Sequence, residues 1–169
     1  MIRNILAVIA GFAVFCVVTV TIEFANAKVF NPGFAELAET KDKAVVQAYE
    51  DSHPGENISG SSELALKRRE VVRELLAGAP VGALLVVLVG YVLASVAGGF
   101  VTAWIGRRTP LVHGLALGGL GTLADIANNS MLPPPLWFWV ASLMVFIPAA
   151  YIGARLAPRP TRAAGAAGE

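Results

Sequence analysis

Four long apolar segments constrain the fold of this 169-residue chain more than any other feature. They cover residues 5–22, 81–105, 111–127 and 136–156, and each is bounded by charged residues, prolines or polar turns. An α-helix needs about 20 mostly apolar residues to cross a hydrocarbon core about 30 Å thick. We therefore expect an all-α integral membrane bundle of four transmembrane helices, at about residues 4–27, 80–106, 110–128 and 135–157.

The composition supports this expectation and excludes several classes of protein. Apolar residues make up 56% of the chain and charged residues 15%, whereas soluble domains carry about 25% charged residues. A single membrane domain over residues 1–169 leaves no room for a separate soluble enzyme. The net charge of +1 and the scattered basic residues argue against a nucleic-acid partner. Segment 5–22 is longer than the core of a secretory signal, about 7–15 residues, so we expect it to stay as a membrane helix.

Residues 28–79 form the one sizeable polar segment, and their pattern predicts a hairpin of two amphipathic helices between the first and second crossings. Asn31-Pro32 is typical of a helix start, and residues 53–57 contain the turn residues that interrupt a helix. Ser61 or Ser62 then supplies the N-cap of the second helix.

Basic residues near the helix ends predict the orientation, because Lys and Arg are retained on the cytoplasmic side. The seven basic residues of segment 28–79 are spread over a long stretch, whereas Arg107 and Arg108 share a very short turn. This density favours both termini in the cytoplasm and an extracytoplasmic hairpin, followed by a mobile C-terminal tail at 158–169. The basic residues on the cytoplasmic side are then Arg3, Arg107, Arg108, Arg155, Arg159 and Arg162.

Small residues recur every fourth position in the second and third predicted crossings. In lipid, helices associate where small side chains let their backbones come close. The pattern therefore predicts a close antiparallel pair between these two helices, and the packing residues would be Gly90, Ala94, Gly98, Gly114 and Gly118.

A polar cluster is predicted near the outer ends of the first and third crossings. Glu23 and Asp125 are carboxylates close to membrane depth, where charges are costly and mark candidate functional sites. With Asn26, Asn128 and Asn129 they would form one ion or polar site. The alternative is a structural role, in which these side chains hydrogen-bond between helices or solvate the helix ends.

Other sequence signals concern anchoring and chemistry. Trp104, Trp137 and Trp139 lie where aromatic side chains anchor helices at the membrane interface. The lone Cys16 has no second thiol for a disulfide or metal pair, and we expect no metal site. No nucleophile has a histidine base nearby in sequence, and no phosphate-binding glycine loop is present, so we expect no catalytic residues and no enzyme activity.

Four short motifs resemble a loose group of small, uncharacterised bacterial four-helix membrane proteins. The resemblance covers the crossings and leaves residues 28–78 largely unmatched. It implies a helical bundle in a bacterial inner membrane, and it carries no functional residues over. The motifs are Ile2-Arg3-Asn4-Ile5-Leu6-Ala7-Val8-Ile9-Ala10-Gly11, Ala97-Gly98-Gly99, Pro135-Leu136-Trp137-Phe138-Trp139 and Gly153-Ala154-Arg155-Leu156.

Two functions are compatible with the sequence. The first is a non-catalytic accessory or scaffolding subunit of a larger membrane complex, whose partners would be membrane lipids and other integral membrane subunits. The alternative is a small transporter or channel that uses Glu23 and Asp125. The sequence leaves the cofactor open, and a subunit that binds a pigment or quinone remains compatible because apolar cofactors need no motif.

Overall fold

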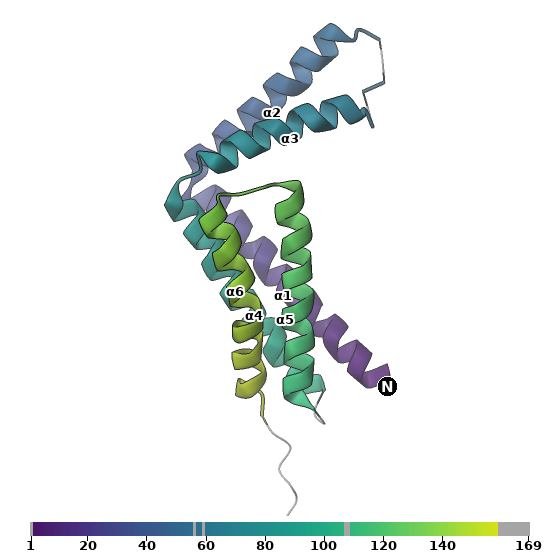
Figure 1. Cartoon of the computed structure of the whole chain (residues 1–169), viewed down its shortest axis with the longest axis vertical. Helices are drawn as coiled ribbons and strands as arrows, with labels where there is room; N and C mark the ends of the chain where they lie inside the picture. Colours follow the sequence, from purple (N-terminus) through teal and green to yellow (C-terminus); the bar gives the residue numbers. More distant parts are fainter. Residues whose placement is uncertain (1, 56, 59, 107–108, 159–169) are drawn as a thin grey trace, which may run out of the picture. The chain divides into compact units, whose positions relative to one another are not determined.

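Helices make up most of the part of the chain that the structure describes. The computed structural model describes residues 2–55, 57–58, 60–106 and 109–158, and none of these residues is in a strand. The predicted all-α fold is therefore confirmed, whereas the Arg107-Arg108 turn and the tail from residue 159 lie outside the described residues. The helices in Figure 1 are α1 (Ile2–Ala25), the π-helical η1 (Asn26–Phe30), α2 (Pro32–Ser52), α3 (Ser62–Ala77), α4 (Val81–Ile105), α5 (Pro110–Met131) and α6 (Leu136–Leu156).

Three helical segments of the described chain are long and apolar enough to cross a membrane, namely Arg3–Phe30, Val81–Ile105 and Leu136–Leu156. They correspond to the first, second and fourth predicted crossings and are consistent with a multi-pass membrane protein. Helix α5 is not among them, since Asp125 and the polar run after it make its second half less apolar. The fourth crossing therefore stays a prediction.

The π-helical segment η1 joins α1 to α2. The backbone N–H of Asn31 donates to the carbonyl of Asn26 at 2.8 Å, which is the five-residue spacing of a π-helix. The Asn31 side chain donates to Asn26 Oδ1 at 2.7 Å, and the Asn26 amide donates to the Ala83 carbonyl of α4 at 3.1 Å. Asn31 precedes α2 as predicted, but its side chain makes no capping bond to that helix because it binds Asn26 instead.

Contacts divide the chain into two compact units. The first contains Met1–Val18, Val92–Thr122 and Val145–Glu169, and the second contains Thr19–Tyr91 and Leu123–Met144. The boundaries fall within α1, α4, α5 and α6, so each of these helices contributes a segment to both units.

Close backbone contacts at glycines organise the first unit. A β-carbon on Gly11 of α1 would lie 2.7 Å from the Gly98 carbonyl of α4, and the reciprocal distance from Gly98 to the Gly11 carbonyl is also 2.7 Å. Between α4 and α6, a β-carbon on Gly99 would lie against the backbone of Ala150. A β-carbon on Gly153 would lie against the backbone of Val96. A larger residue at any of these glycines would meet main chain, which cannot rotate away. Helix α4 therefore contacts both α1 and α6 through its backbone.

The predicted packing residues take part in contacts, and the predicted pairing of the second and third crossings through them stays a prediction. Gly90 faces Ile22 of α1 in the second unit, and Gly98 faces both α1 and Leu117 of α5 in the first. Gly114 and Gly118 of α5 face α6, with Ala154 beside Gly114 and Ile147 beside Gly118. Ala94 is fully buried. A stripe of small residues marks a face for close packing and does not identify the opposing helix.

Helices α2 and α3, in the second unit, lie side by side (Figure 1). Ser61 caps α3, since its Oγ accepts the Leu64 N–H at 3.2 Å and also lies 2.8 Å from the Tyr49 hydroxyl. Arg68 of α3 binds Asp42 of α2 with two hydrogen bonds of 2.7 and 2.8 Å. The two helices are thus joined by a capped end, a buried tyrosine and a bidentate ion pair.

Replacement of Gly98 by alanine is expected to destabilise the protein. The new methyl group would press on the Gly11 carbonyl and on the Leu117 side chain, and such overpacking costs about 1–3 kcal/mol. Gly119→Ala in α5 is the matched control, because no atom lies within 4 Å of its β-carbon position. Thermal unfolding in a mild detergent measures both, and equal melting temperatures for the two variants would contradict this account of the α1–α4 contact.

Candidate functional site

A buried polar cluster lies between α5 and α6 in the second unit. It consists of Asp125 and Asn129 on α5 and Ser142 on α6, and we call it the Asp125 cluster. The exposed fractions of these residues are 4%, 2% and 0%. Asp125 and Asn129 are four residues apart and therefore share one face of their helix. Three buried polar side chains from two helices thus meet.

The hydrogen bonds of the cluster converge on one oxygen. Asp125 Oδ2 accepts from Ser142 Oγ at 2.6 Å and from Asn129 Nδ2 at 2.9 Å. Asn129 Nδ2 also lies 3.3 Å from Ser142 Oγ. Asp125 Oδ1 is buried and makes no hydrogen bond with any other described residue. The carboxyl group therefore has one satisfied and one unsatisfied oxygen.

This arrangement limits the chemistry that is available. The ion pairs among the described residues all lie on α2 and α3, so no lysine or arginine balances a charge on Asp125. A buried carboxylate without a positively charged partner is costly, and a bound proton or a small cation removes that cost. Any cation would be held by Asp125 with neutral amide and hydroxyl oxygens, since the described residues contain no group of three His, Cys, Asp or Glu side chains suited to a metal ion.

The five residues of the predicted polar site differ in burial and in hydrogen-bond partners. Asp125 and Asn129 lie together and are buried, whereas Glu23 and Asn128 are exposed. Asn26 is half-buried. Its side-chain amide donates a hydrogen bond to the Ala83 carbonyl, and its side-chain oxygen accepts one from Asn31. Both carboxylates lie within electrostatic range of Tyr91, a buried residue of α4.

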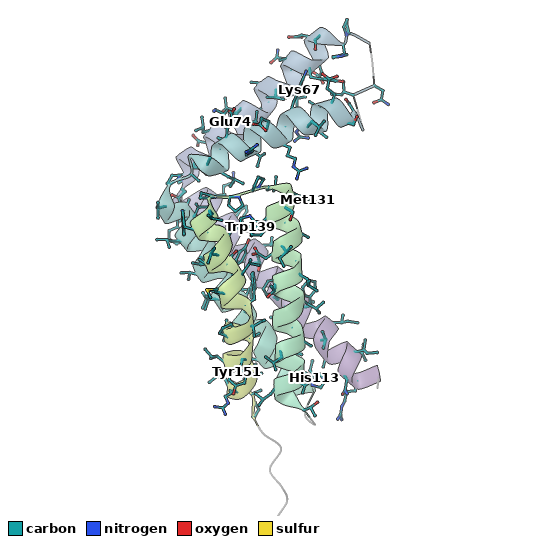
Figure 2. The ribbon with its side chains drawn as sticks, in the orientation of Figure 1. Lys67, Glu74, His113, Met131, Trp139 and Tyr151 are labelled. Atoms are coloured by element: carbon teal, nitrogen blue, oxygen red, sulfur yellow. The ribbon has the colours of Figure 1, made fainter. Side chains whose placement is uncertain are left out.

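Ser142 belongs to this site and was not recognised from the sequence. It is 17 residues from Asp125, so no local spacing connects the two residues. The sequence feature that could have identified Ser142 is a polar side chain one turn after Trp139 in an otherwise apolar helix. It lies near the start of α6, which follows the polar end of α5 in the chain. Figure 2 labels Trp139 near the start of α6.

A second polar contact involves Arg69 of α3, which binds the end of α5. Its Nε donates to the Met131 carbonyl at 2.6 Å, and its Nη2 donates to the Ser130 carbonyl at 2.5 Å. The last carbonyls of a helix have no partner within the helix and carry partial negative charge, so a guanidinium satisfies them well. Met131, labelled in Figure 2, marks this end of α5.

Most charges of the α2–α3 pair are balanced by neighbours. Lys43 contacts Glu39 at 2.6 Å, as the sequence spacing suggests, and Lys67 contacts Glu63 at 2.9 Å. The hydrogen bond from Lys43 lowers the pKa of Glu39, and that from Lys67 lowers the pKa of Glu63. These exposed pairs contribute little to stability, because water and salt screen them. They give the two helices a charged surface of mixed sign.

The predicted anchors occupy helix ends. Trp104 is near the end of α4 and exposed. Trp137 is exposed in the first turn of α6, and Trp139 is partly buried. Exposed tryptophans at the ends of apolar helices are typical of side chains at the level of lipid head groups.

Replacement of Ser142 by alanine is expected to lower stability by about 1 kcal/mol, a typical net value for a hydrogen bond within a protein. The change removes the 2.6 Å bond to Asp125 and leaves that carboxyl group with fewer partners. Ser130→Ala is the control, because the Ser130 side chain is exposed and donates to a carbonyl of its own helix. Thermal unfolding in detergent compares the two, and a loss of equal size in both variants would show that the cluster does not join α5 to α6.

No family model, curated protein or solved structure matches this chain. Its role must therefore be argued from its own residues and their geometry.

Proposed function

We propose that this protein is a non-catalytic accessory or scaffolding subunit of a larger complex in a bacterial inner membrane. In this proposal α1, α4, α5 and α6 all cross the bilayer, both termini lie in the cytoplasm, and α2 and α3 form an extracytoplasmic hairpin. Its partners are membrane lipids and other integral membrane subunits.

The uncovered surface of α1 carries this proposal. Only 17% of the most apolar part of Arg3–Phe30 is buried within the chain, compared with 39% for Val81–Ile105 and 33% for Leu136–Leu156. Large apolar side chains are exposed along the whole helix. A helix so little covered by its own chain offers a long contact face to a neighbouring membrane subunit. The exposed residues are Ile5, Leu6, Ile9, Val17, Val20 and Phe24.

The inclusion of α5 as a fourth crossing has independent support. Its 22 residues extend about 33 Å, which is enough to span the hydrocarbon core. The polar residues Asp125 and Asn129 face α6 rather than lipid, so they do not exclude the helix from the membrane. Arg69 satisfies two of its terminal carbonyls where the chain would reach the interface.

The hairpin adds a second contact region. A groove of about 350 Å³ lies where α2 begins and α3 ends, and Phe34, Leu37 and Leu75 are among its lining residues. Leu37 is exposed there beside the charged side chains of Lys41 and Glu74. Apolar side chains rimmed by charges are typical of sites where a partner docks.

Extraction in a mild detergent followed by native mass analysis tests the proposal. We expect the protein to be recovered with at least one other membrane subunit. The double variant Val17→Trp and Val20→Trp, which alters the exposed face of α1, should lose that subunit. Met144→Trp, at an exposed position of α6, is the control and should keep it. Recovery of a lone monomer from the native membrane would contradict the accessory role.

A small transporter or channel is the second candidate, and the unsatisfied Oδ1 of Asp125 favours it. A carboxyl group with one free oxygen in a buried site can take up and release a proton or a small cation. In liposomes that contain the purified protein, this candidate predicts a proton flux that falls at least tenfold in Glu23→Gln and Asp125→Asn. Glu50→Gln, at an exposed position of α2, is the control. Absence of flux in the unmodified protein would reject this candidate and leave the accessory role untouched.

A further inference from the structure

A groove lies between α3 and the end of α5, within the second unit. Its volume is about 440 Å³, inside the range of about 300–1,000 Å³ that is typical of small-molecule pockets. Its charged lining residues are Asp42 of α2 and Arg68 and Arg69 of α3, and we call it the Arg69 groove. Asp42 is about 15 Å along the helix axis from the end of α2 at Ser52, so the groove is set back from the tip of the hairpin.

The charges that line the groove do not cancel. Arg68 binds Asp42 through its Nε and Nη2 atoms at 2.7 and 2.8 Å, so this carboxylate already has a partner. Arg69 donates to two carbonyls of α5 and forms no ion pair with a carboxylate of the described residues. The described lining therefore has one guanidinium charge in excess, and only the partial negative charge of a helix end offsets it.

Both guanidinium groups keep hydrogen-bond donors for a ligand. An arginine side chain has five N–H groups, and the bonds of Arg68 and Arg69 each use the Nε and Nη2 atoms. The Nη1 atoms of the two side chains have no partner among the described residues. Planar donors of this kind bind phosphate oxygens well. Two adjacent arginines in one groove therefore favour a phosphate group as the ligand.

Apolar side chains adjoin the two arginines. Met131, at the end of α5 (Figure 2), is 64% exposed. Residues 132–135 alone separate α5 from α6, whose first turn contains the exposed Trp137, and such tryptophans are typical of the level of lipid head groups. Cationic donors beside apolar surface at this level match a phospholipid. The apolar lining residues are Ala65, Val72, Met131 and Leu132.

We propose that the Arg69 groove binds the phosphate of an anionic phospholipid, with part of an acyl chain against Met131 and Leu132. The inference rests on the proposed function in one respect, namely that this end of α5 reaches the membrane surface. A lipid with one net negative charge balances the excess guanidinium. A zwitterionic lipid also brings an ammonium group, and Asp42, the carboxylate of the described lining, is already paired. Phosphatidylglycerol should therefore bind in preference to phosphatidylethanolamine.

Titration calorimetry on the full chain in a non-ionic detergent tests the proposal. The probes are dihexanoyl phosphatidylglycerol, dihexanoyl phosphatidylethanolamine and inorganic phosphate. We expect phosphatidylglycerol to bind, and each of the other two probes to bind at least tenfold more weakly. A higher NaCl concentration should weaken the binding of phosphatidylglycerol, because salt screens exposed charges.

Variants of Arg69 test the role of its charge. Arg69→Gln removes the excess charge and should weaken phosphatidylglycerol binding at least tenfold. Arg73→Gln is the matched control, since Arg73 is on the same helix, pairs with Glu70 and does not line the groove. Arg69→Lys loses the planar fork but keeps the charge, so it should bind this lipid more tightly than Arg69→Gln. Equal losses in these two variants would show that the contact with α5 was measured instead of the charge, and would contradict the proposal.

A second pair of variants leaves both arginines in place. Ala65→Glu adds a carboxylate at an exposed lining position and should weaken phosphatidylglycerol binding at least tenfold. Leu66→Glu is its control, because Leu66 is the exposed neighbour that does not line the groove. Melting temperatures show whether each variant folds, and this pair decides the question if Arg69→Gln does not fold.

Three further results would overturn the proposal. The first is that phosphatidylglycerol does not bind the unmodified protein. The second is that phosphatidylethanolamine or inorganic phosphate binds as tightly. The third is that Ala65→Glu and Leu66→Glu change binding by the same factor. Each outcome is independent of whether a partner subunit is recovered, because the calorimetry uses the purified chain alone, so the accessory role can fail or stand separately.

Discussion

Helices in lipid gain little from burying apolar side chains, so direct contact between their atoms decides which surfaces meet. In the first unit, this contact is made by glycines on α1, α4 and α6. Gly11 and Gly98 bring two backbones together, and Gly99 and Gly153 do the same on another contact of α4. Helix α4 is thereby fixed between two neighbours without large side chains at the contact points. The outward apolar side chains remain available for lipid or for another subunit.

Many polar groups of the described residues are satisfied locally, whereas buried oxygens of Thr19, Ser95 and Asp125 make no hydrogen bond. Arg69 satisfies helix-end carbonyls, Asn26 binds a backbone carbonyl of α4, and the charges of α2 and α3 are mostly paired. Asp125 differs, since one of its oxygens is buried without a partner among the described residues. A structural role explains the bonds to Asn129 and Ser142 but not the second oxygen.

The sequence predicted the features that depend on neighbouring residues. The all-helical fold follows from the apolar runs, and the Ser61 cap follows from its position at the start of an amphipathic helix. Features that depend on distant residues were not predictable. Ser142 lies 17 residues from Asp125, and Arg69 binds carbonyls 61 and 62 residues away. The glycine stripes likewise identified close-packed faces, but the helix opposite each face depends on how the whole chain folds.

The contact of Arg69 with α5 involves main-chain atoms only, and this has a consequence for evolution. Because the guanidinium binds carbonyl oxygens of residues 130 and 131, the identity of those two side chains hardly matters to the contact. Sequence drift at positions 130 and 131 should therefore be tolerated. Position 69 has much less freedom, since lysine has no planar fork with which to reach two carbonyls at once. Among divergent homologues, an invariant arginine opposite a variable dipeptide would be the expected signature.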